Sequence, residues 1–263
     1  MRISLGQFDV SQGEINANLK TISELAAEAS SVKSDLLCLP EMATTGFNWM
    51  RNRELLDESD HTPRALADLA LKYSISICGS FLERTEKEGM ANTLYFFSKE
   101  GEILGQYRKI HLFTQFDEGR YVEAGNRPLV IDTAVGKIGF GICYDLRFPE
   151  QFRKNNELGA ALQLLPAAFP HPRLEHWRTL IRARAIENQS FFVATNQSGC
   201  EAHVGKSGEV EYFGHSMIVD PWGEIIAEGG ESEALISAEI DLAEVTKTRA
   251  ILTAWKDRRP NLF

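Results

Sequence analysis

Three residues at the ends of apolar runs have side chains that together could perform nucleophilic catalysis. Glu41 follows the letters LLCLP, Lys109 stands in YRKIHLF, and Cys143 stands in GFGICYDLRFPE. A free thiol has a pKa of about 8.5, so only a few per cent of it is the nucleophilic thiolate at pH 7. A neighbouring carboxylate could accept the thiol proton, and an ammonium could stabilise the thiolate and then an oxyanion.

Each of these residues alone has a more ordinary explanation. A glutamate after a strand is usually exposed, and Lys109 is one of 28 basic residues. A free cysteine is usually a small buried hydrophobe, which is our interpretation of Cys38 and Cys78 within their apolar runs. The three strand-end positions together favour catalysis, because α/β sheets bind ligands beyond the carboxyl ends of their strands.

The elements that must position these residues occur in two similar passes along the chain. The first pass predicts strands at 2–9, 35–39, 74–81, 92–98 and 102–108, with helices near 16–30 and 63–73. The second pass predicts strands at 137–143, 161–165, 190–196, 215–220 and 224–228, with helices near 149–157 and 174–188. Alternating strands and helices indicate layered α/β packing, with two stacked sheets and helices outside.

Short sequence matches in preserved order indicate an internal duplication. RISLG resembles KIGFG, LLCLPEM resembles LQLLPAA, and GEIL resembles GEII. The symmetry fails where Ala167 replaces the equivalent of Glu41, and where Phe8 or Gln7 stands in place of Cys143. Polar groups present in only one copy of a duplicated scaffold indicate a functional site.

Composition restricts the class of protein. The 263 residues fit a single domain spanning 1–263, and 43% hydrophobic with 25% charged residues is typical of a soluble globular chain. The net charge of −9 argues against nucleic acid or an anionic membrane as partner. The four cysteines form no Cys-x-x-Cys pair, and no apolar run reaches the length of a membrane span. We therefore expect a cytoplasmic protein without disulfides or a metal site.

Three motifs identify a family resemblance across essentially the whole chain. LLCLPEM, YRKIHLF and GICYDLRFPE, in this order and spacing, resemble the nitrilase, or carbon–nitrogen hydrolase, superfamily. The resemblance implies a four-layer α-β-β-α sandwich, no cofactor, and a Glu-Lys-Cys triad of Glu41, Lys109 and Cys143. It also implies a second glutamate after the lysine motif, where Glu118 of DEGRYVEAG fits better than Glu123.

The family mechanism then implies a role for each residue. Glu41 takes the proton of Cys143, and the thiolate attacks an amide carbon. Lys109 and the backbone N–H of Tyr144 hold the oxyanion. Ammonia leaves with a proton from Glu41, helped by Glu118, and water hydrolyses the thioester.

The residues after the cysteine narrow the branch of the family. True nitrilases typically have Cys-Trp-Glu and carbamoylase-like members often have Gln-Trp shortly after it, whereas this chain has CYDLRFPE, which resembles the ω-amidase branch. Those enzymes deaminate amides such as 2-oxoglutaramate and 2-oxosuccinamate. Their far carboxylate would suit a bidentate arginine, and Arg147 and Arg173 are the candidates. The alternative for Arg147 is an ion pair with Asp145 or Glu150.

Several further residues have two interpretations. Phe47 and Trp49 either line the pocket or pack within a loop. The segment 198–213 is polar and glycine-rich, so we expect a loop that either rims the site or frays, with Cys200 exposed and not catalytic. His215 is expected to serve packing or an interface.

Four other functions compete with the ω-amidase interpretation. A broad-specificity aliphatic amidase or an N-carbamoyl amidohydrolase would use the same triad. A Cys-His hydrolase would pair Cys143 with His176 or His215, but it leaves Glu41 and Lys109 without a role. A degenerate relative that only binds an acidic metabolite or a protein would have no reason to keep all three triad members.

The C-terminal segment, about 241–263, suggests how copies of the chain associate. It carries Trp255, Leu262 and Phe263 in a charged context, and members of the family generally form dimers. By this analogy we expect a homodimer or a higher homo-oligomer with the tail at the interface.

Overall fold

Two six-stranded β-sheets form the centre of the computed structural model, which describes residues 1–202, 208–259 and 262. In spatial order, the first sheet contains β14 (Ala234–Glu239), β1 (Arg2–Gln7), β2 (Leu36–Cys38), β3 (Ser76–Arg84), β4 (Met90–Phe97) and β5 (Ile103–Arg108). The second contains β13 (Ile225–Glu228), β12 (Met217–Val219), β9 (Phe191–Asn196), β8 (Leu162–Ala167), β7 (Gly136–Phe140) and β6 (Val130–Thr133).

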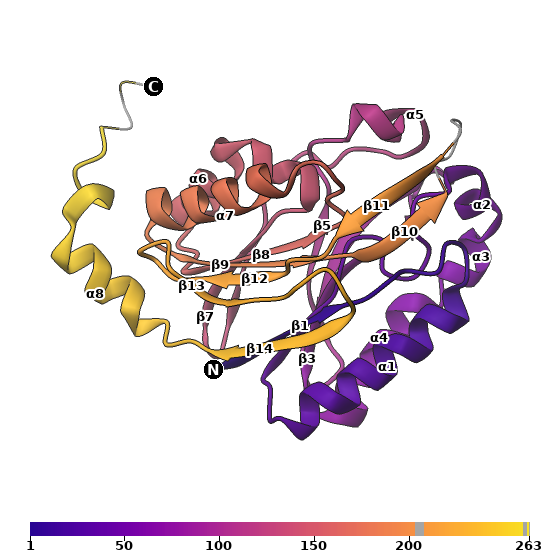
Figure 1. Ribbon diagram of the computed structural model, residues 1–263, viewed down its shortest axis with the longest axis horizontal. Helices are drawn as coiled ribbons and strands as arrows, with labels where there is room; N and C mark the ends of the chain where they lie inside the picture. Colours follow the sequence, from indigo (N-terminus) through magenta and orange to yellow (C-terminus); the bar gives the residue numbers. More distant parts are fainter. Residues whose placement is uncertain (203–207, 260–261, 263) are drawn as a thin grey trace.

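Helices cover the outer face of each sheet (Figure 1). The first sheet is covered by α1 (Ile15–Ser31) and α4 (Thr62–Tyr73), and the second by α6 (Pro149–Glu157) and α7 (Leu174–Asn188). The inner faces of the sheets share one hydrophobic core, in which residues such as Ile3 and Leu36 join residues such as Ile138 and Leu164. The predicted α-β-β-α sandwich is confirmed.

The two sheets repeat one topology, which confirms the duplication. Starting from β14 in the first sheet and from β6 in the second, an antiparallel edge strand is followed by three parallel strands and then by two antiparallel ones. The register agrees with the sequence matches, because Ile3 pairs with Leu36 in the first sheet and Ile138 pairs with Leu162 in the second. The edge strands β14 and β6 were not predicted, since both are short and only partly buried.

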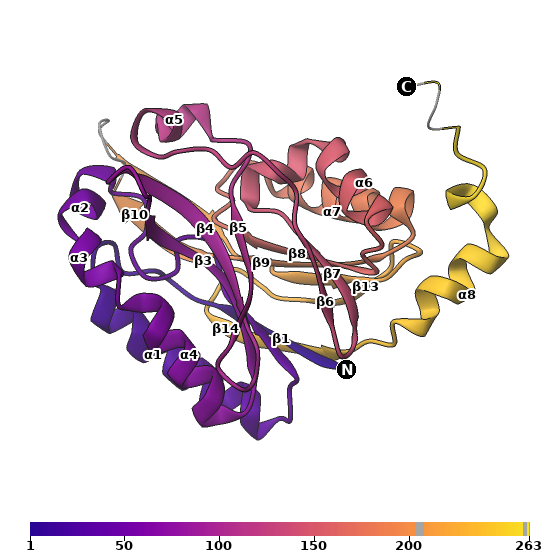
Figure 2. The same cartoon turned by 180° about the vertical axis from the view of Figure 1, so that it is seen from behind.

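The remaining elements surround the sandwich. They are α2 (Trp49–Glu54), α3 (Leu56–Ser59), α5 (Glu118–Tyr121), α8 (Ala243–Ile251), the hairpin strands β10 (Ser198–Ala202) and β11 (Glu209–Phe213), and 3-10 turns at Thr114–Phe116, Cys143–Arg147 and Thr253–Trp255. The α8 helix lies at one end of the molecule, beyond the sheets (Figure 2). Phe263 lies outside the described residues. In the part of the chain described here, no helix is both long and apolar enough to cross a bilayer.

Two expectations about local structure were wrong. The strand predicted to run to Cys143 ends at Phe140, and Cys143 begins a 3-10 turn. In segment 198–213, the described residues 198–202 and 209–213 form two paired antiparallel strands and not a loop, with Ser198 opposite Phe213 and Ala202 opposite Glu209. Its outward-facing polar side chains concealed the strand pattern.

Candidate active site

Lys109 lies between two carboxylates in the interior of the molecule. Its Nζ donates to Glu41 Oε1 at 2.7 Å and to Glu118 Oε2 at 2.8 Å. All three side chains are at most 2% exposed. Burial of an unpaired charge is very unfavourable, so these groups require one another. Two carboxylates and one ammonium nevertheless leave a net charge of −1 in this cluster.

The side chains of Glu41, Lys109 and Glu118 come from three separate segments of the chain. Glu41 follows β2 and is succeeded by Met42 in the left-handed region, with a φ of 49°. Lys109 follows β5, where its backbone N–H donates to the carbonyl of Asn92 at 2.9 Å. Glu118 begins α5 directly after Asp117, which is also left-handed with a φ of 49°. Non-glycine residues seldom adopt this conformation, so the chain bends sharply beside both glutamates.

Asn92 is a member of the site that sequence reasoning missed. From β4 its Nδ2 donates to Glu41 Oε1 at 2.8 Å and to Glu118 Oε1 at 3.1 Å. Two backbone donors complete the arrangement, because Ala168 N–H reaches Glu41 Oε2 at 3.1 Å and Phe113 N–H reaches Glu118 Oε2 at 2.6 Å. Each carboxylate is therefore fixed by several donors. The sequence shows no sign of these partners for Asn92, which lies in a strand that is buried along its whole length.

Cys143 is held in a strained conformation next to Glu41. Its φ is 41°, which costs about 1 kcal/mol or more for a residue with a side chain. Its thiol interacts electrostatically with the Glu41 carboxylate, and the residue is 8% exposed. The turn therefore holds the cysteine without the flexibility of a loop.

The carboxylate of Asp145 fixes the turn that carries Cys143. It accepts from Ile142 N–H at 2.8 Å and from the Tyr107 hydroxyl at 2.7 Å through Oδ2. Its Oδ1 accepts from the backbone N–H of His111 at 3.0 Å and lies 2.7 Å from that residue's Nδ1. Asp145 was expected only as an ion-pair partner for Arg147. It instead ties the turn to the chain on both sides of Lys109.

Burial and charge make the resting thiol neutral. Burial, with the Glu41 carboxylate adding to it, raises the pKa of Cys143 well above its usual value, and Lys109 opposes the shift without cancelling it. Burial and then Glu118 also raise the pKa of Glu41, against the opposing effect of Lys109. Burial alone would lower the pKa of Lys109, but Glu118 and Glu41 outweigh it and raise that pKa. The sequence suggested that Lys109 would favour a thiolate, whereas the structure favours a thiol beside a strengthened base.

Comparison with known proteins shows the family. The profile described as carbon-nitrogen hydrolase matches residues 2–250. The chain belongs to the carbon–nitrogen hydrolase family. This confirms the resemblance drawn from the three motifs, and it makes the protein a hydrolase of carbon–nitrogen bonds other than peptide bonds.

Individual relatives of this hydrolase are similar over their whole length. The 2-oxoglutaramate amidase of Bacillus subtilis is 39% identical over 262 residues, which cover 99% of this chain and 98% of that protein. The crystal structure of Saccharomyces cerevisiae Nit3, a member of branch 10 of the nitrilase superfamily, has a TM-score of 0.88 at 30% identity, over 98% of this chain and 96% of that one.

A third relative shows a modified nucleophile. In a glutamate-to-glutamine variant of the amidase from Nesterenkonia sp. AN1, acrylamide has added to the active-site cysteine. That structure has a TM-score of 0.84 at 26% identity and covers 96% of this chain and 98% of that one.

Arg147 is the last residue of the cysteine turn, and its charge is unpaired among the described residues. Its guanidinium carbon lies 5.1 Å from the centre of the Phe169 ring, and within the described residues it takes part in no ion pair. The pairs considered with Asp145 and Glu150 are therefore not found there. Tyr144 packs its ring against Phe113, with centroids 5.0 Å apart. A partly buried arginine without a counter-ion is suited to an anionic ligand.

Arg173 and Phe47, unlike Arg147, are held by contacts with neighbouring residues of the chain. Arg173 donates to Gln115 Oε1 at 2.7 Å and to the carbonyl of His171 at 3.2 Å. Phe47 is 6% exposed and packs edge-on to Trp49 and Phe116, at centroid distances of 5.6 and 5.7 Å. Phe47 thus belongs to a packed wall near the glutamates, and Arg173 to the connection before α7.

The histidines proposed for a Cys-His pair have other positions. His176 is exposed on α7, and His215 lies 2.8 Å from Glu228 Oε1 through its Nδ1. The strongest influences on the Cys143 thiol are its burial, Glu41, Lys109 and the backbone of Ala168. This arrangement favours a glutamate as the base. Among the described residues, no cluster of three or more potential ligands could hold a metal ion.

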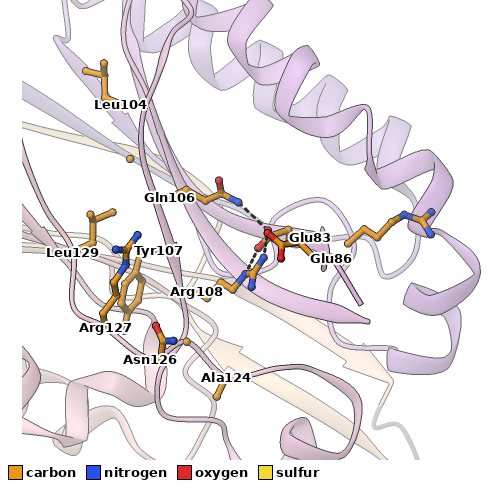
Figure 3. A pocket seen from close by; sticks show the side chains of 13 residues that line it. Glu83, Glu86, Leu104, Gln106, Tyr107, Arg108, Ala124, Asn126, Arg127 and Leu129 are labelled. Atoms are coloured by element: carbon orange, nitrogen blue, oxygen red, sulfur yellow. Dashed lines mark hydrogen bonds and ion pairs between the residues drawn. The ribbon is translucent and has the colours of Figure 1, made fainter. Parts of the chain in front are cut away.

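A separate hollow of about 820 Å³ lies along the edge of the first sheet (Figure 3). Its lining includes Gln106 and Arg108 of β5, and both side chains bond to Glu83. It also includes Tyr107, whose hydroxyl supports Asp145. Within this lining, the Arg108 guanidinium is paired with the Glu83 carboxylate at 2.7 Å.

Proposed function

We propose that this hydrolase is an amidase that removes the terminal amide of small carboxylate-bearing substrates, as in the conversion of 2-oxoglutaramate to a keto acid and ammonia. The observation that carries the proposal is the buried Glu41–Lys109–Glu118 cluster beside Cys143, with the unpaired Arg147 near the same turn. The 2-oxoglutaramate amidase of Bacillus subtilis, 39% identical over the whole chain, supports the choice of substrate.

The raised pKa values support proton transfer that accompanies attack. Because the pKa of Cys143 is raised, the resting sulfur keeps its proton, and Glu41 takes that proton as the sulfur attacks the amide carbon. The pKa of Glu41 is also raised, so its protonated form is a good acid for the departing ammonia. Glu118 and Asn92 keep Glu41 and Lys109 in register for both transfers. Water then hydrolyses the thioester, with Glu41 again acting as base.

The tetrahedral intermediate needs donors that are already in place. Lys109 is fixed by its two carboxylates, and the backbone N–H of Tyr144 belongs to the turn that Asp145 holds rigid. We assign these two groups to the oxyanion. Removal of one such donor typically lowers kcat by about 10²–10³. A fixed donor stabilises the transition state without reorganisation, which is why burial of Lys109 benefits catalysis.

The substrate carboxylate is assigned to Arg147. A guanidinium offers two parallel N–H donors to a carboxylate, and Arg147 has no competing ion pair among the described residues. Arg173 is the second candidate, although it already bonds to Gln115. Phe47, packed near the glutamates, would enclose the aliphatic part of the substrate.

The test compares two amides and two arginine variants. Ammonia release is measured from 2-oxoglutaramate and from butyramide, which lacks the carboxylate. We expect the wild type to prefer 2-oxoglutaramate, and Arg147→Ala to lose about 10²-fold in kcat/KM for that substrate alone, since a charge-assisted pair is lost. Arg173→Ala is the matched control, with a smaller loss expected.

Two results would overturn the substrate assignment. A wild type that prefers butyramide would favour the broad-specificity aliphatic amidase, for which the butyramide complex of a cysteine-to-alanine variant of the Nesterenkonia relative is the supporting observation. Equal losses on both amides in Arg147→Ala would mean that Arg147 maintains the turn and does not bind the carboxylate.

We also propose a cytoplasmic homodimer, or a higher homo-oligomer, formed by a single domain of residues 1–263 with the C-terminal segment at the interface. Ile251 is 75% and Leu262 60% exposed, which supports contact with another copy. Trp255 lies under the guanidinium of Arg258 at 3.6 Å, so residues 255–258 have a defined arrangement on their own chain. Size-exclusion chromatography with light scattering at micromolar concentration tests this, and a monomer would contradict it.

A further inference from the structure

A buried carboxylate that the proposed mechanism does not use lies in the β10 strand. Glu201 is 3% exposed, and it has no basic partner among the described residues. A buried ionised carboxylate without a counter-ion is unfavourable unless hydrogen bonds compensate it. Its position therefore calls for a functional explanation.

Three neutral donors from different parts of the chain converge on Glu201. Gln197 Nε2 donates to Oε1 at 2.9 Å, while Phe47 N–H at 3.1 Å and Gln12 Nε2 at 3.2 Å donate to Oε2. The carboxylate thus joins the β10–β11 hairpin to the connection after β1 and to the segment that follows Glu41. Of these contacts, the one to Phe47 leads towards the active site.

The segment at Phe47 is shaped to fit this carboxylate. Gly46 has a φ of 61°, and a Cβ atom on it would lie 2.7 Å from Glu201 Oε1. The Phe47 ring then packs against Trp49 and against Phe116, in the turn just before Glu118. Glu201 therefore reaches the surroundings of Glu118 through the aromatic side chain of Phe47.

We propose that Glu201 is a positioning residue that holds the Phe47 wall of the substrate pocket in place, so that substrate affinity depends on its negative charge. The inference rests on the proposed function, because it concerns the pocket of that amidase. A charged carboxylate accepts the three donors more strongly than a neutral one. Loss of the charge releases Phe47 N–H, loosens the wall and raises KM, while the Glu41–Lys109–Cys143 geometry that sets kcat remains.

The electrostatic surroundings make this charge sensitive to neutral pH. Burial raises the pKa of Glu201 to about 7, although the hydrogen bonds from Gln197, Phe47 and Gln12 oppose the shift. Among the described residues, the charged neighbour is Asp9, whose negative charge raises the pKa further. Tyr212 of β11 also interacts electrostatically with Glu201, but its own raised pKa keeps it neutral. The contact by which Glu201 holds the Phe47 wall should therefore weaken as the pH falls below about 7.

The experiment uses Glu201→Gln, which removes the charge at nearly constant shape, and Glu201→Asp, which keeps it. The matched control is Glu211→Gln, the same change at an exposed site on the paired strand. KM and kcat for the amide that the wild type hydrolyses are measured from about pH 5.5 to about 8.5. At the upper limit we expect Glu201→Gln to raise KM by about fivefold to tenfold, with kcat changed less than about threefold, as for one lost hydrogen bond. Its KM should lack the transition near pH 7 that the wild type, Glu201→Asp and Glu211→Gln show.

A second readout needs no substrate. Trp49 packs edge-on to Phe47, so its emission should report movement of the wall. We expect a fluorescence transition near pH 7 in the wild type and in Glu211→Gln, and none in Glu201→Gln. Wild-type KM and an intact transition in folded Glu201→Gln would overturn the proposal. If the wild type hydrolyses no amide, the proposed function fails, and the fluorescence titration still decides the role of Glu201.

Discussion

The two halves of the sandwich have the same topology but different chemistry at their strand ends. In the first half, β2 leads to Glu41, whereas in the second half β8 ends in Ala167 at the equivalent position. Conversely, β7 leads to Cys143, whereas β1 leads to Phe8. The backbone alone therefore does not create the site. Each half supplies what the other lacks, and the carboxylate from one meets the thiol from the other between the sheets.

The physical contrast is between a buried polar cluster and a packed apolar equivalent. Glu41 is 1% exposed and depends on Lys109 and Asn92, while Ala167 is fully buried in the core and needs no partner. The first half can bury a carboxylate at this strand end because Lys109 and Asn92 bind it there. We expect the equivalent strand end of the second half, at Ala167, not to tolerate such a charge. Four predictions test this contrast.

The largest effect is expected at the nucleophile. Cys143→Ala should lower ammonia release by at least about 10⁴-fold, because no other group can form the thioester. Binding of substrate and the melting temperature should change little. The control is Cys200→Ala, an exposed thiol on β10, which should keep wild-type activity. Substantial turnover by Cys143→Ala would assign catalysis to another group.

The next effect concerns the apolar equivalent of Glu41. Ala167→Glu should lower the free energy of unfolding by about 3–5 kcal/mol at pH 8, because it buries a carboxylate among apolar neighbours. Ala167→Gln has nearly the same volume without the charge, so it isolates the electrostatic part. Urea denaturation of both variants measures the difference. Equal stabilities at pH 8 would mean that the second half accommodates a charge as easily as the first.

The sequence predicted those parts of the fold and site that local patterns determine. The parallel strands, the four main helices and the positions of Glu41 and Lys109 followed from apolar runs and motifs. Asn92, Asp145 and Glu201 were missed because their partners come from distant segments, and a polar residue in a strand carries no local signal of its partner. The left-handed turn at Cys143 was missed for a related reason, since tertiary hydrogen bonds to Asp145 impose it.

The pH dependence of catalysis is the third prediction. In the proposed mechanism Glu41 must be ionised to accept the thiol proton, and burial raises its pKa. The acid limb of kcat/KM should therefore have its midpoint above the ordinary pKa of glutamate, about 4.3, and fall about tenfold per pH unit below it. Steady-state rates in overlapping buffers measure the limb. Activity that stays constant down to about pH 4.5 would show that the base is not a buried carboxylate of this kind.

The smallest expected effect distinguishes the buried charge of Glu201 from the paired charges of the triad. The pKa of Glu201 is raised to about 7 in the folded protein, so folding favours the protonated carboxyl. The resulting contribution to stability is fully present below the pKa of glutamate in the unfolded chain and is lost as the pH rises through 7. Replacement by glutamine removes that loss. The melting temperature of Glu201→Gln relative to wild type should therefore increase between about pH 5 and about pH 8, by a few degrees for roughly 1–2 kcal/mol. Differential scanning calorimetry of Glu201→Gln and Glu211→Gln measures it, and a pH-independent difference would contradict the raised pKa. A charge that destabilises the fold at pH 8 is retained only where another property requires it, and the contact with Phe47 supplies that property.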